Sequence, residues 1–374
     1  MLRLVLPVLF ALISLLTFVK APSNFFWRVQ VALTEFPYIS ILASLALLVC
    51  CFWFEKYRWP GIAISAVAFL LFLLPVLRAY SRASGLNREL VAALPSAQQS
   101  NSGFSFLNMF SAPPSVTPKE LVYKTVNGKN LTLDFYAAGV RTAPCVIVIH
   151  GGSWSSGDNK QFVEWNAWMS SMGYHVAAIN YRLAPEFKSP SQVEDVGSAI
   201  DFLKTQSTLG IDTNNFCLMG RSAGGQIALC AAYQLHRPEI KGVISFYAPA
   251  DMVWGAKIKG NPLVLNTDDV FADYLGGPYD QFADKYYESS AVQHVAKDSP
   301  PTLIIHGDND CMVSFKHSQH LDSALTVTGV PHYFLNLPGA THACDYNLNG
   351  PSGQLSQAAI TVFLGSTFRD SIIQ

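Results

Sequence analysis

The sequence predicts an α/β domain, a mostly parallel sheet flanked by helices, preceded by an N-terminal bundle of about three transmembrane helices. Three observations predict it. The first third of the 374-residue chain holds three long apolar stretches without charge. From residue 118 onward, short apolar runs alternate with helix-favouring segments, as expected for strands joined by helical crossovers. One run leads directly into Gly220-Arg221-Ser222-Ala223-Gly224, a glycine-flanked serine between a strand and a helix.

The apolar stretches cover about residues 4–19, 38–54 and 60–77, each close to the ~20 residues that a helix needs to cross a bilayer. Aromatic side chains flank them, as at membrane interfaces: Trp27, Trp53, Tyr57, Trp59 and Tyr80. Residues 1–82 are therefore expected to anchor a multi-pass integral membrane protein in the lipid bilayer. The first stretch, which follows Arg3, also resembles a secretory signal, so a cleaved leader is the alternative there.

Three spans place the N-terminus and the C-terminal domain on opposite faces of the membrane. Lys20 and Arg28 then lie in a loop on the side of the C-terminal domain. Basic residues on that side outnumber those on the other: Lys20, Arg28, Arg78, Arg82 and Arg88 against Arg3, Lys56 and Arg58. The positive-inside rule favours, by a small margin, a cytoplasmic C-terminal domain. Residues 83–117, rich in Ser, Ala, Asn, Gln and Pro, are expected to form a linker.

Composition excludes several classes of function. The formal net charge is −1 and no Lys/Arg-rich run occurs, so no nucleic-acid partner is expected. Seven cysteines are too few and too scattered for a disulfide scaffold, and the sequence contains no Cys-x-x-Cys pair. We expect neither a metal ion nor a cofactor.

The soluble domain, residues 118–374, opens with a predicted hairpin, because two apolar runs flank Asn127-Gly128, a dipeptide that favours a tight turn. Continuous apolar runs then predict strands buried on both faces, at residues 145–149, 176–179, 216–219, 243–246, 302–305 and 333–337. Helices are expected at residues 162–172, 192–205, 226–235 and 354–364. The aromatic-rich insertion at residues 250–298 is interpreted as a cap over an apolar substrate pocket, or else as an ordinary packed surface excursion.

Ser222 has the sequence context of a nucleophile, since a strand, a sharp turn and a helix together expose a serine hydroxyl at the top of a sheet. Upstream, His150-Gly151-Gly152-Ser153-Trp154 follows the first long strand. Glycine lets the backbone approach a substrate oxygen closely, so the N–H groups of Gly151 and Gly152, with that of Ala223, are predicted to form an oxyanion hole.

A serine nucleophile also needs a base and an orienting carboxylate. The run at residues 302–305 leads into a loop with two acids, Asp308 and Asp310, and the run at 333–337 leads into a loop ending at His342. A serine, then an acid, then a histidine is the order that this elbow architecture imposes. The remaining histidines are interpreted as structural, such as His306 and His332, or as surface residues on helices, such as His236 and His317.

Taken together, these motifs resemble the α/β-hydrolase esterases of the hormone-sensitive-lipase-like and feruloyl-esterase-like groups, over residues 118–367. The segments that carry the resemblance are 150–154, 180–186, 220–225, 306–310 and 339–342. The resemblance implies an α/β-hydrolase fold, a serine carboxylesterase without cofactor and a small-molecule ester substrate. It implies the triad Ser222, Asp310 and His342, because these families place the acid last in His-Gly-x-x-Asp. It further implies that residues 180–186 and Asp195 only support the site.

Arg221 departs from the family pattern, and we expect it to point away from the site and pair with a carboxylate. Cys311 and Cys344 adjoin the acid and the base, so a disulfide between the two loops is an open alternative. Two other functions stay open: an amidase, formamidase or peptidase that uses the same triad, and a catalytically silent scaffold on the same fold. The oligomeric state is not predicted.

Overall fold

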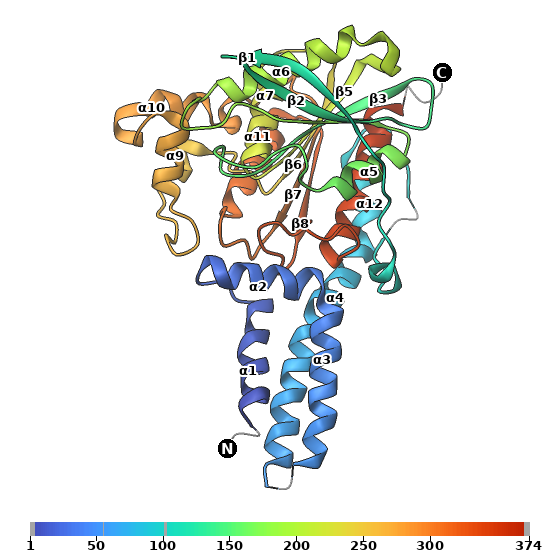
Figure 1. Cartoon of the computed structure of the whole chain (residues 1–374), viewed down its shortest axis with the longest axis vertical. Helices are drawn as coiled ribbons and strands as arrows, with labels where there is room; N and C mark the ends of the chain where they lie inside the picture. The colour runs from blue at the N-terminus through green and yellow to red at the C-terminus, as the bar shows by residue number, and fades with distance from the viewer. Residues whose placement is uncertain (1–3, 55, 101–102, 370–374) are drawn as a thin grey trace.

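The computed structural model describes residues 4–54, 56–100 and 103–369, so Arg3 lies outside the described residues. Its central sheet has eight strands in the order β1-β2-β4-β3-β5-β6-β7-β8. The β1–β2 and β2–β4 pairs are antiparallel, and all other neighbouring strands are parallel. The predicted mostly parallel sheet is therefore confirmed (Figure 1).

Each predicted apolar run lies within a strand. The predicted hairpin is also present, and its turn residues Asn127 and Gly128 have positive φ values of 50° and 75°. The strands are β1 (Lys119–Val126), β2 (Lys129–Tyr136), β3 (Ala143–Ile149), β4 (His175–Ile179), β5 (Ile211–Arg221), β6 (Ile240–Phe246), β7 (Thr302–Gly307) and β8 (His332–Leu337).

The sheet is buried on both faces. Along β3, Val146 and Val148 belong to one core cluster, whereas Ile147 and Ile149 belong to the other, as the two-residue period of a strand requires. One face packs against α5 (Val163–Ser171) and α12 (Pro351–Thr367), and the other against α6 (Ser191–Thr205), α7 (Ala223–Gln234) and α11 (Lys316–Thr328). The insertion after β6 contains α8 (Met252–Gly255), α9 (Thr267–Leu275) and α10 (Tyr279–Glu288).

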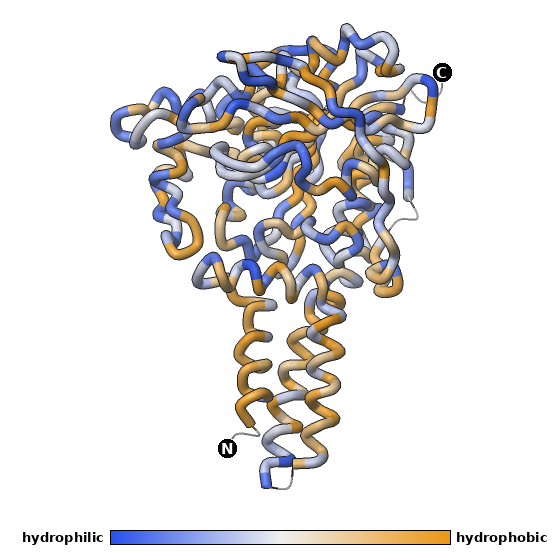
Figure 2. The backbone as a smooth tube through the Cα atoms, viewed as in Figure 1, coloured by the Kyte–Doolittle hydropathy of each residue, from blue (hydrophilic) through white to orange (hydrophobic). Residues whose placement is uncertain are grey.

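A stalk of three helices projects from this domain (Figure 1). It consists of α1 (Val5–Ser14), α3 (Pro37–Cys50) and the first half of α4 (Arg58–Ala93), while α2 (Asn24–Glu35) lies across its upper end. The stalk is apolar along its length and polar at its tip (Figure 2). Among the described residues, α4 alone is long and apolar enough to cross a membrane, and a second span results if α2 and α3, bent by 87°, are counted as one. One or two such helices are weak evidence of membrane association.

The prediction of a linker at residues 83–117 is wrong for its first part, because α4 continues without a break to Ala93 and residues 83–93 are helical. Leu86 and Leu90, one turn apart, are completely buried where α4 packs against α12. Burying a leucine contributes about 1.5–3 kcal/mol. This long-range packing, which composition does not reveal, holds the segment in helical form.

Helix α2 occupies a segment that the sequence indicated to be a loop. The side chain of Gln30 is buried, and its Nε2 donates to the carbonyl oxygens of Leu16 at 2.7 Å and Val19 at 2.9 Å. These bonds satisfy carbonyl groups at and just after the end of the first helix. The α1–α2 connection is therefore held in a defined conformation beneath the domain.

Glu35, the last residue of α2, is buried where α2 meets the start of α12. Ser352 Oγ donates to Glu35 Oε1 at 2.9 Å, and Asn347 Nδ2 donates to the Glu35 carbonyl oxygen at 2.8 Å. Burial raises the pKa of Glu35 from 4.5 to about 8. The carboxyl group is therefore mainly neutral at pH 7.

The stability of the protein should depend on pH through this residue. Folded Glu35 holds its proton more tightly than the unfolded chain does, so stability is lost as the pH rises from 4.5 to about 8. Glu35→Gln is expected to raise the midpoint of thermal unfolding by about 3 °C or more at pH 9, but by less than about 1 °C at pH 5. Thermal unfolding of the full-length protein in detergent measures this difference. Glu186→Gln, at an exposed carboxylate, is the control, and equal shifts at both pH values would contradict the role of Glu35.

Candidate active site

Ser222 lies in the sharp turn between β5 and α7. Its backbone has φ 52° and ψ −120°, a conformation that non-glycine residues rarely adopt and that marks a strained turn. A Cβ on Gly224 would lie 2.3 Å from the carbonyl oxygens of Ile149 and His150, so only glycine lets α7 approach β3 this closely. Helix packing therefore requires the glycine that the sequence motif supplies, and the turn exposes the serine hydroxyl.

The loops after β7 and β8 bring an acid and a histidine to Ser222. His342 Nε2 lies 3.0 Å from Ser222 Oγ, and His342 Nδ1 lies 2.7 Å from Asp310 Oδ2. Burial by itself raises the pKa of Asp310, but His342 and His306 hold it well below its usual range. Asp310 is therefore a carboxylate that accepts from Nδ1–H, which leaves Nε2 of His342 free to accept the Ser222 proton.

Three further contacts fix the Asp310 carboxylate. Its Oδ1 accepts hydrogen bonds from the N–H groups of Met312 at 2.7 Å and Val313 at 2.9 Å. On the other oxygen, His306 Nε2 lies 3.1 Å from Oδ2. The interpretation of His306 as structural therefore missed its contact with the acid. The sequence signal that could have revealed this contact is the position of His306, near the end of β7 and four residues before Asp310.

Asp308 has a different role from Asp310. Its Oδ1 accepts from the N–H of Gly339 at 2.7 Å, so it joins the loop after β7 to the loop that carries His342. This contact shapes the site without touching either Ser222 or His342.

The loop after β3 lies directly against the serine turn. A Cβ on Gly151 would be 3.4 Å from Ser222 Cβ, and Gly152 has φ +124°. The ring of His150 stacks on Tyr181 with centroids 4.2 Å apart, and Tyr181 Oη donates to the His150 carbonyl oxygen at 3.1 Å. Burial lowers the pKa of His150 to about 4, so the ring is neutral and braces the loop.

On the other side of Ser222, Ala223 opens α7. The first N–H groups of a helix have no partner within the helix, and the helix dipole makes that end favourable for negative charge. The structure thus places Gly151 and Ala223 next to Ser222, with Gly152 beside Gly151 in the same loop. The sequence predicted that the N–H groups of these three residues form an oxyanion hole.

The insertion after β6 closes over this loop. Trp154 stacks on Tyr274 of α9, with ring centroids 4.3 Å apart and an interplanar angle of 4°. Gln226 of α7 joins the two rings, because its Oε1 accepts from Trp154 Nε1 at 2.9 Å and from Tyr274 Oη at 3.2 Å. The insertion is therefore attached to the loop after β3 through aromatic stacking.

A cavity of about 260 Å³ opens at Ser222. Its apolar wall includes Ile258, Leu265 and Phe271 of the insertion. His317 of α11 also lines it, buried against the ring of Trp254, so the expectation that His317 is a surface residue is wrong. The four-residue spacing of His317, Leu321 and Leu325 places them on one buried stripe of α11, which the sequence could have revealed.

Arg221 is buried and pairs with a carboxylate, as expected. Its Nε donates to Asp345 Oδ2, and Tyr247 Oη donates to Asp345 Oδ1 at 2.5 Å. The guanidinium lies 4.4 Å from the ring centroid of Phe162 and 5.1 Å from that of Phe246. Arg221 therefore joins the serine turn to the loop that follows His342.

The alternative of a disulfide is not realised, because Cys311 and Cys344 are both free. Cys311 Sγ instead lies 3.9 Å from Thr341 Oγ1. Among the described residues, no group of three or more His, Cys, Asp and Glu side chains has an arrangement that could hold a metal ion.

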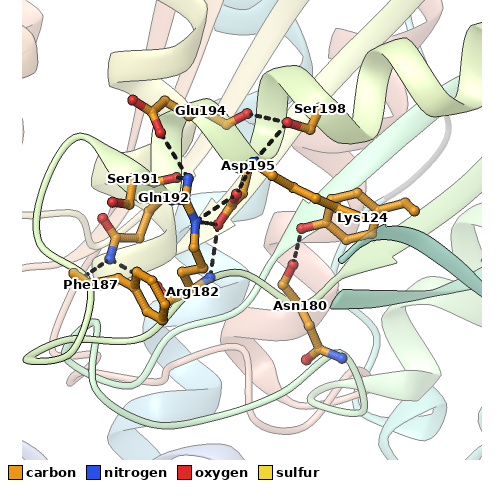
Figure 3. A network of polar contacts seen from close by, with 10 residues as sticks. Lys124, Asn180, Arg182, Phe187, Ser191, Gln192, Glu194, Asp195 and Ser198 are labelled. Carbon is orange, nitrogen blue, oxygen red and sulfur yellow. Dashed lines mark hydrogen bonds and ion pairs between the residues drawn. The ribbon is translucent and has the colours of Figure 1, made fainter. Parts of the chain in front are cut away.

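Asp195 supports the loop beneath the site (Figure 3). Its carboxylate accepts from the backbone N–H and the Nε of Arg182, both at 2.9 Å, and from Lys124 Nζ at 2.7 Å. Arg182 Nη2 also donates to Glu194 at 2.8 Å. Further along this loop, Ala184 N–H donates to the carbonyl oxygen of Trp154 at 2.9 Å. The network therefore braces the loop after β3, and its charged side chains do not line the cavity.

The eight-stranded, mostly parallel sheet, with a serine in a strand-to-helix elbow, defines an α/β-hydrolase. The chain belongs to the BD-FAE family, whose model matches residues 133–325, and so to the α/β-hydrolase carboxylesterases. It is 27% identical over 249 residues to esterase LipC of Mycobacterium tuberculosis, covering 61% of this chain and 60% of that relative.

The chain is also similar to a plant esterase and to an esterase of known structure. An isoprenylcysteine alpha-carbonyl methylesterase of Arabidopsis thaliana is 26% identical, over 53% of this chain and 50% of that protein. The fold is similar to that of the thermophilic esterase Est2 of Thermogutta terrifontis, with a TM-score of 0.55, 20% identity, and coverage of 68% of this chain and 92% of that structure. The chain spans 60% or less of the length of the mycobacterial relatives that it matches.

Proposed function

We propose that this protein is a membrane-anchored serine carboxylic-ester hydrolase that acts through Ser222, His342 and Asp310. The observation that carries the proposal is the chain of two contacts, 3.0 Å from Ser222 Oγ to His342 Nε2 and 2.7 Å from His342 Nδ1 to Asp310 Oδ2. Membership of the carboxylesterase family supports an ester as the substrate.

In the first half of the reaction, His342 takes the proton of Ser222, and Ser222 Oγ attacks the ester carbonyl carbon. The N–H groups of Gly151, Gly152 and Ala223 stabilise the negative charge that forms on the carbonyl oxygen. His342 then gives its proton to the departing alcohol, which leaves an acyl group on Ser222. In the second half, His342 takes a proton from water as the water oxygen attacks the acyl carbonyl carbon, and the bond to Ser222 Oγ then breaks as His342 returns that proton to Ser222 and the acid leaves.

The apolar stalk supports membrane anchoring, because α4 is long and apolar enough to cross a bilayer. The shorter apolar helices α1 and α3, which pack against α4, are the other two proposed spans. The outward side chains of the stalk are large, apolar and exposed to solvent in the isolated chain, among them Leu6, Leu12, Leu42, Leu45, Val67 and Leu70. Contiguous apolar surface of this kind is costly in water and stable in a bilayer. The count of basic residues supports a catalytic domain on the cytoplasmic side.

Covalent labelling tests the proposed chemistry. A fluorophosphonate probe is expected to label the wild-type protein and not Ser222→Ala, because the probe reacts only with an activated serine. The same preparations are assayed with a short-chain aryl ester and the matching anilide. Faster turnover of the ester than of the anilide supports an esterase, whereas the reverse supports the amidase alternative. Labelling of Ser222→Ala, or absence of labelling and turnover in the wild type, would reject the proposed role of Ser222.

A further inference from the structure

The catalytic edge of the sheet faces the membrane anchor. The loop that carries His342 contacts α2 directly, since Trp27 Nε1 donates to the carbonyl oxygen of His342 at 2.9 Å. The insertion over the site also meets the anchor, because the N–H of Asn24 donates to the carbonyl oxygen of Leu263 at 2.8 Å. The proposed nucleophile therefore lies on the side of the domain from which the stalk projects (Figure 1).

The anchor also forms part of the cavity wall. Lys20, in the connection between α1 and α2, lines the same 260 Å³ cavity as Ser222. Residues of the 258–267 segment of the insertion line the cavity too, among them Ile258 and Leu265. Asn261 Nδ2 donates to the carbonyl oxygen of Pro22 at 2.9 Å and holds these two segments together. The segment that leaves the first apolar helix thus contributes one residue, Lys20, to the lining of the cavity.

Exposed apolar side chains surround this junction. Leu263 is 70% exposed and Phe25 is 68% exposed, although the contacts at Asn24 and Asn261 fix the backbone beside both. Phe18 and Val19, at the end of the first helix, are exposed as well. With α1 in a bilayer, these four residues, here called the apolar rim, lie at the membrane surface. Apolar side chains at that depth are stabilised by contact with lipid.

We propose that the site takes its substrate from the bilayer, as an ester that carries a long apolar chain and enters along the apolar rim, where residues 18–26 meet residues 258–267. This inference rests on the proposed esterase activity. The cavity is smaller than the about 300–1,000 Å³ of pockets that enclose a whole drug-sized ligand. It therefore accommodates the ester end, while the far end of the chain stays in the lipid and is never transferred to water.

The apolar rim can be tested with one substitution and a matched control. Leu263→Glu adds a charge at the rim without removing a buried side chain. Val327→Glu is the control, because its side chain is 88% exposed at the C-terminal end of α11, just before β8 begins at the edge of the sheet opposite the site. Full-length protein in phosphatidylcholine vesicles is assayed with p-nitrophenyl palmitate in the bilayer and with p-nitrophenyl acetate in water. Leu263→Glu is expected to lower kcat/KM for the palmitate about tenfold and to change that for the acetate less than about twofold. Val327→Glu changes neither.

A second measurement needs no variant. At constant bulk concentration of p-nitrophenyl palmitate, added phosphatidylcholine dilutes it within the bilayer, and the rate should fall in proportion to its mole fraction. A rate that follows bulk concentration, or a Leu263→Glu variant that affects both esters equally or neither, would overturn entry from the bilayer. Failure of the esterase proposal is distinct, because the wild type would then not hydrolyse the acetate, or Ser222→Ala still would.

Discussion

Replacing Asp310 by asparagine is expected to lower kcat about 10³- to 10⁴-fold. The Asp310 carboxylate accepts from His342 Nδ1 at 2.7 Å and thereby selects the tautomer whose Nε2 takes the serine proton. An asparagine that presents its NH2 group to Nδ1 favours the other tautomer, whose Nε2 already carries a hydrogen. Steady-state hydrolysis of a short-chain aryl ester measures the loss.

Asp308→Asn is the matched control for this prediction. It lies two residues away on the same loop, and asparagine keeps the Oδ1 that accepts from Gly339 N–H. Its kcat is expected to stay within about threefold of the wild type, because no proton of the reaction passes near it. Comparable losses in the two variants would show that the loop's conformation matters and the Asp310 charge does not.

Replacing Asp345 by alanine is expected to lower the free energy of unfolding by about 3–5 kcal/mol. Asp345 is completely buried and is the carboxylate that pairs with Arg221, whose side chain is only 2% exposed. Its removal leaves a buried guanidinium whose charge no anion compensates, and Tyr247 loses its acceptor. Denaturant unfolding, followed by tryptophan fluorescence, measures the change.

Two further variants separate charge from packing. Glu288→Ala breaks the exposed Lys285–Glu288 pair and is expected to cost less than about 1 kcal/mol. Arg221→Met combined with Asp345→Ala removes both buried charges and should recover part of the loss of the single variant. If the double variant is less stable than Asp345→Ala alone, the contacts of Arg221 with Phe162 and Phe246 matter more than its charge.

The sequence predicted those parts of the molecule that local patterns determine. Asn127-Gly128 encodes its own turn, and continuous apolar runs are required wherever a sheet is covered on both faces. The site residues could be proposed because each follows a strand, and parallel strands bring their carboxyl ends to one edge of the sheet. This is why Ser222 and His342, 120 positions apart, could be expected to lie side by side.

Features that depend on contacts between distant segments were beyond prediction. The continuation of α4 through Leu90 needs the surface of α12, and the partner of Arg221 is Asp345, more than 100 residues away. Helix α2 is likewise held by distant groups, such as the His342 carbonyl oxygen that accepts from Trp27. The exposed or buried state of His317 depends on how α11 packs, although its four-residue spacing from Leu321 and Leu325 gave a partial signal.

The unbroken helix α4 has a consequence for how the enzyme meets its substrate. It runs from the tip of the stalk to Ala93 and packs on α12 of the catalytic domain. Helix α2 makes a second attachment, because it contacts the loop that carries His342. A domain attached in this way cannot tumble independently of its anchor. With the stalk in a bilayer, as proposed, the protein rotates about the membrane normal and diffuses laterally, so its search for an ester held in that bilayer takes place in two dimensions. Encounter rates then depend on the surface density of the ester in that one leaflet.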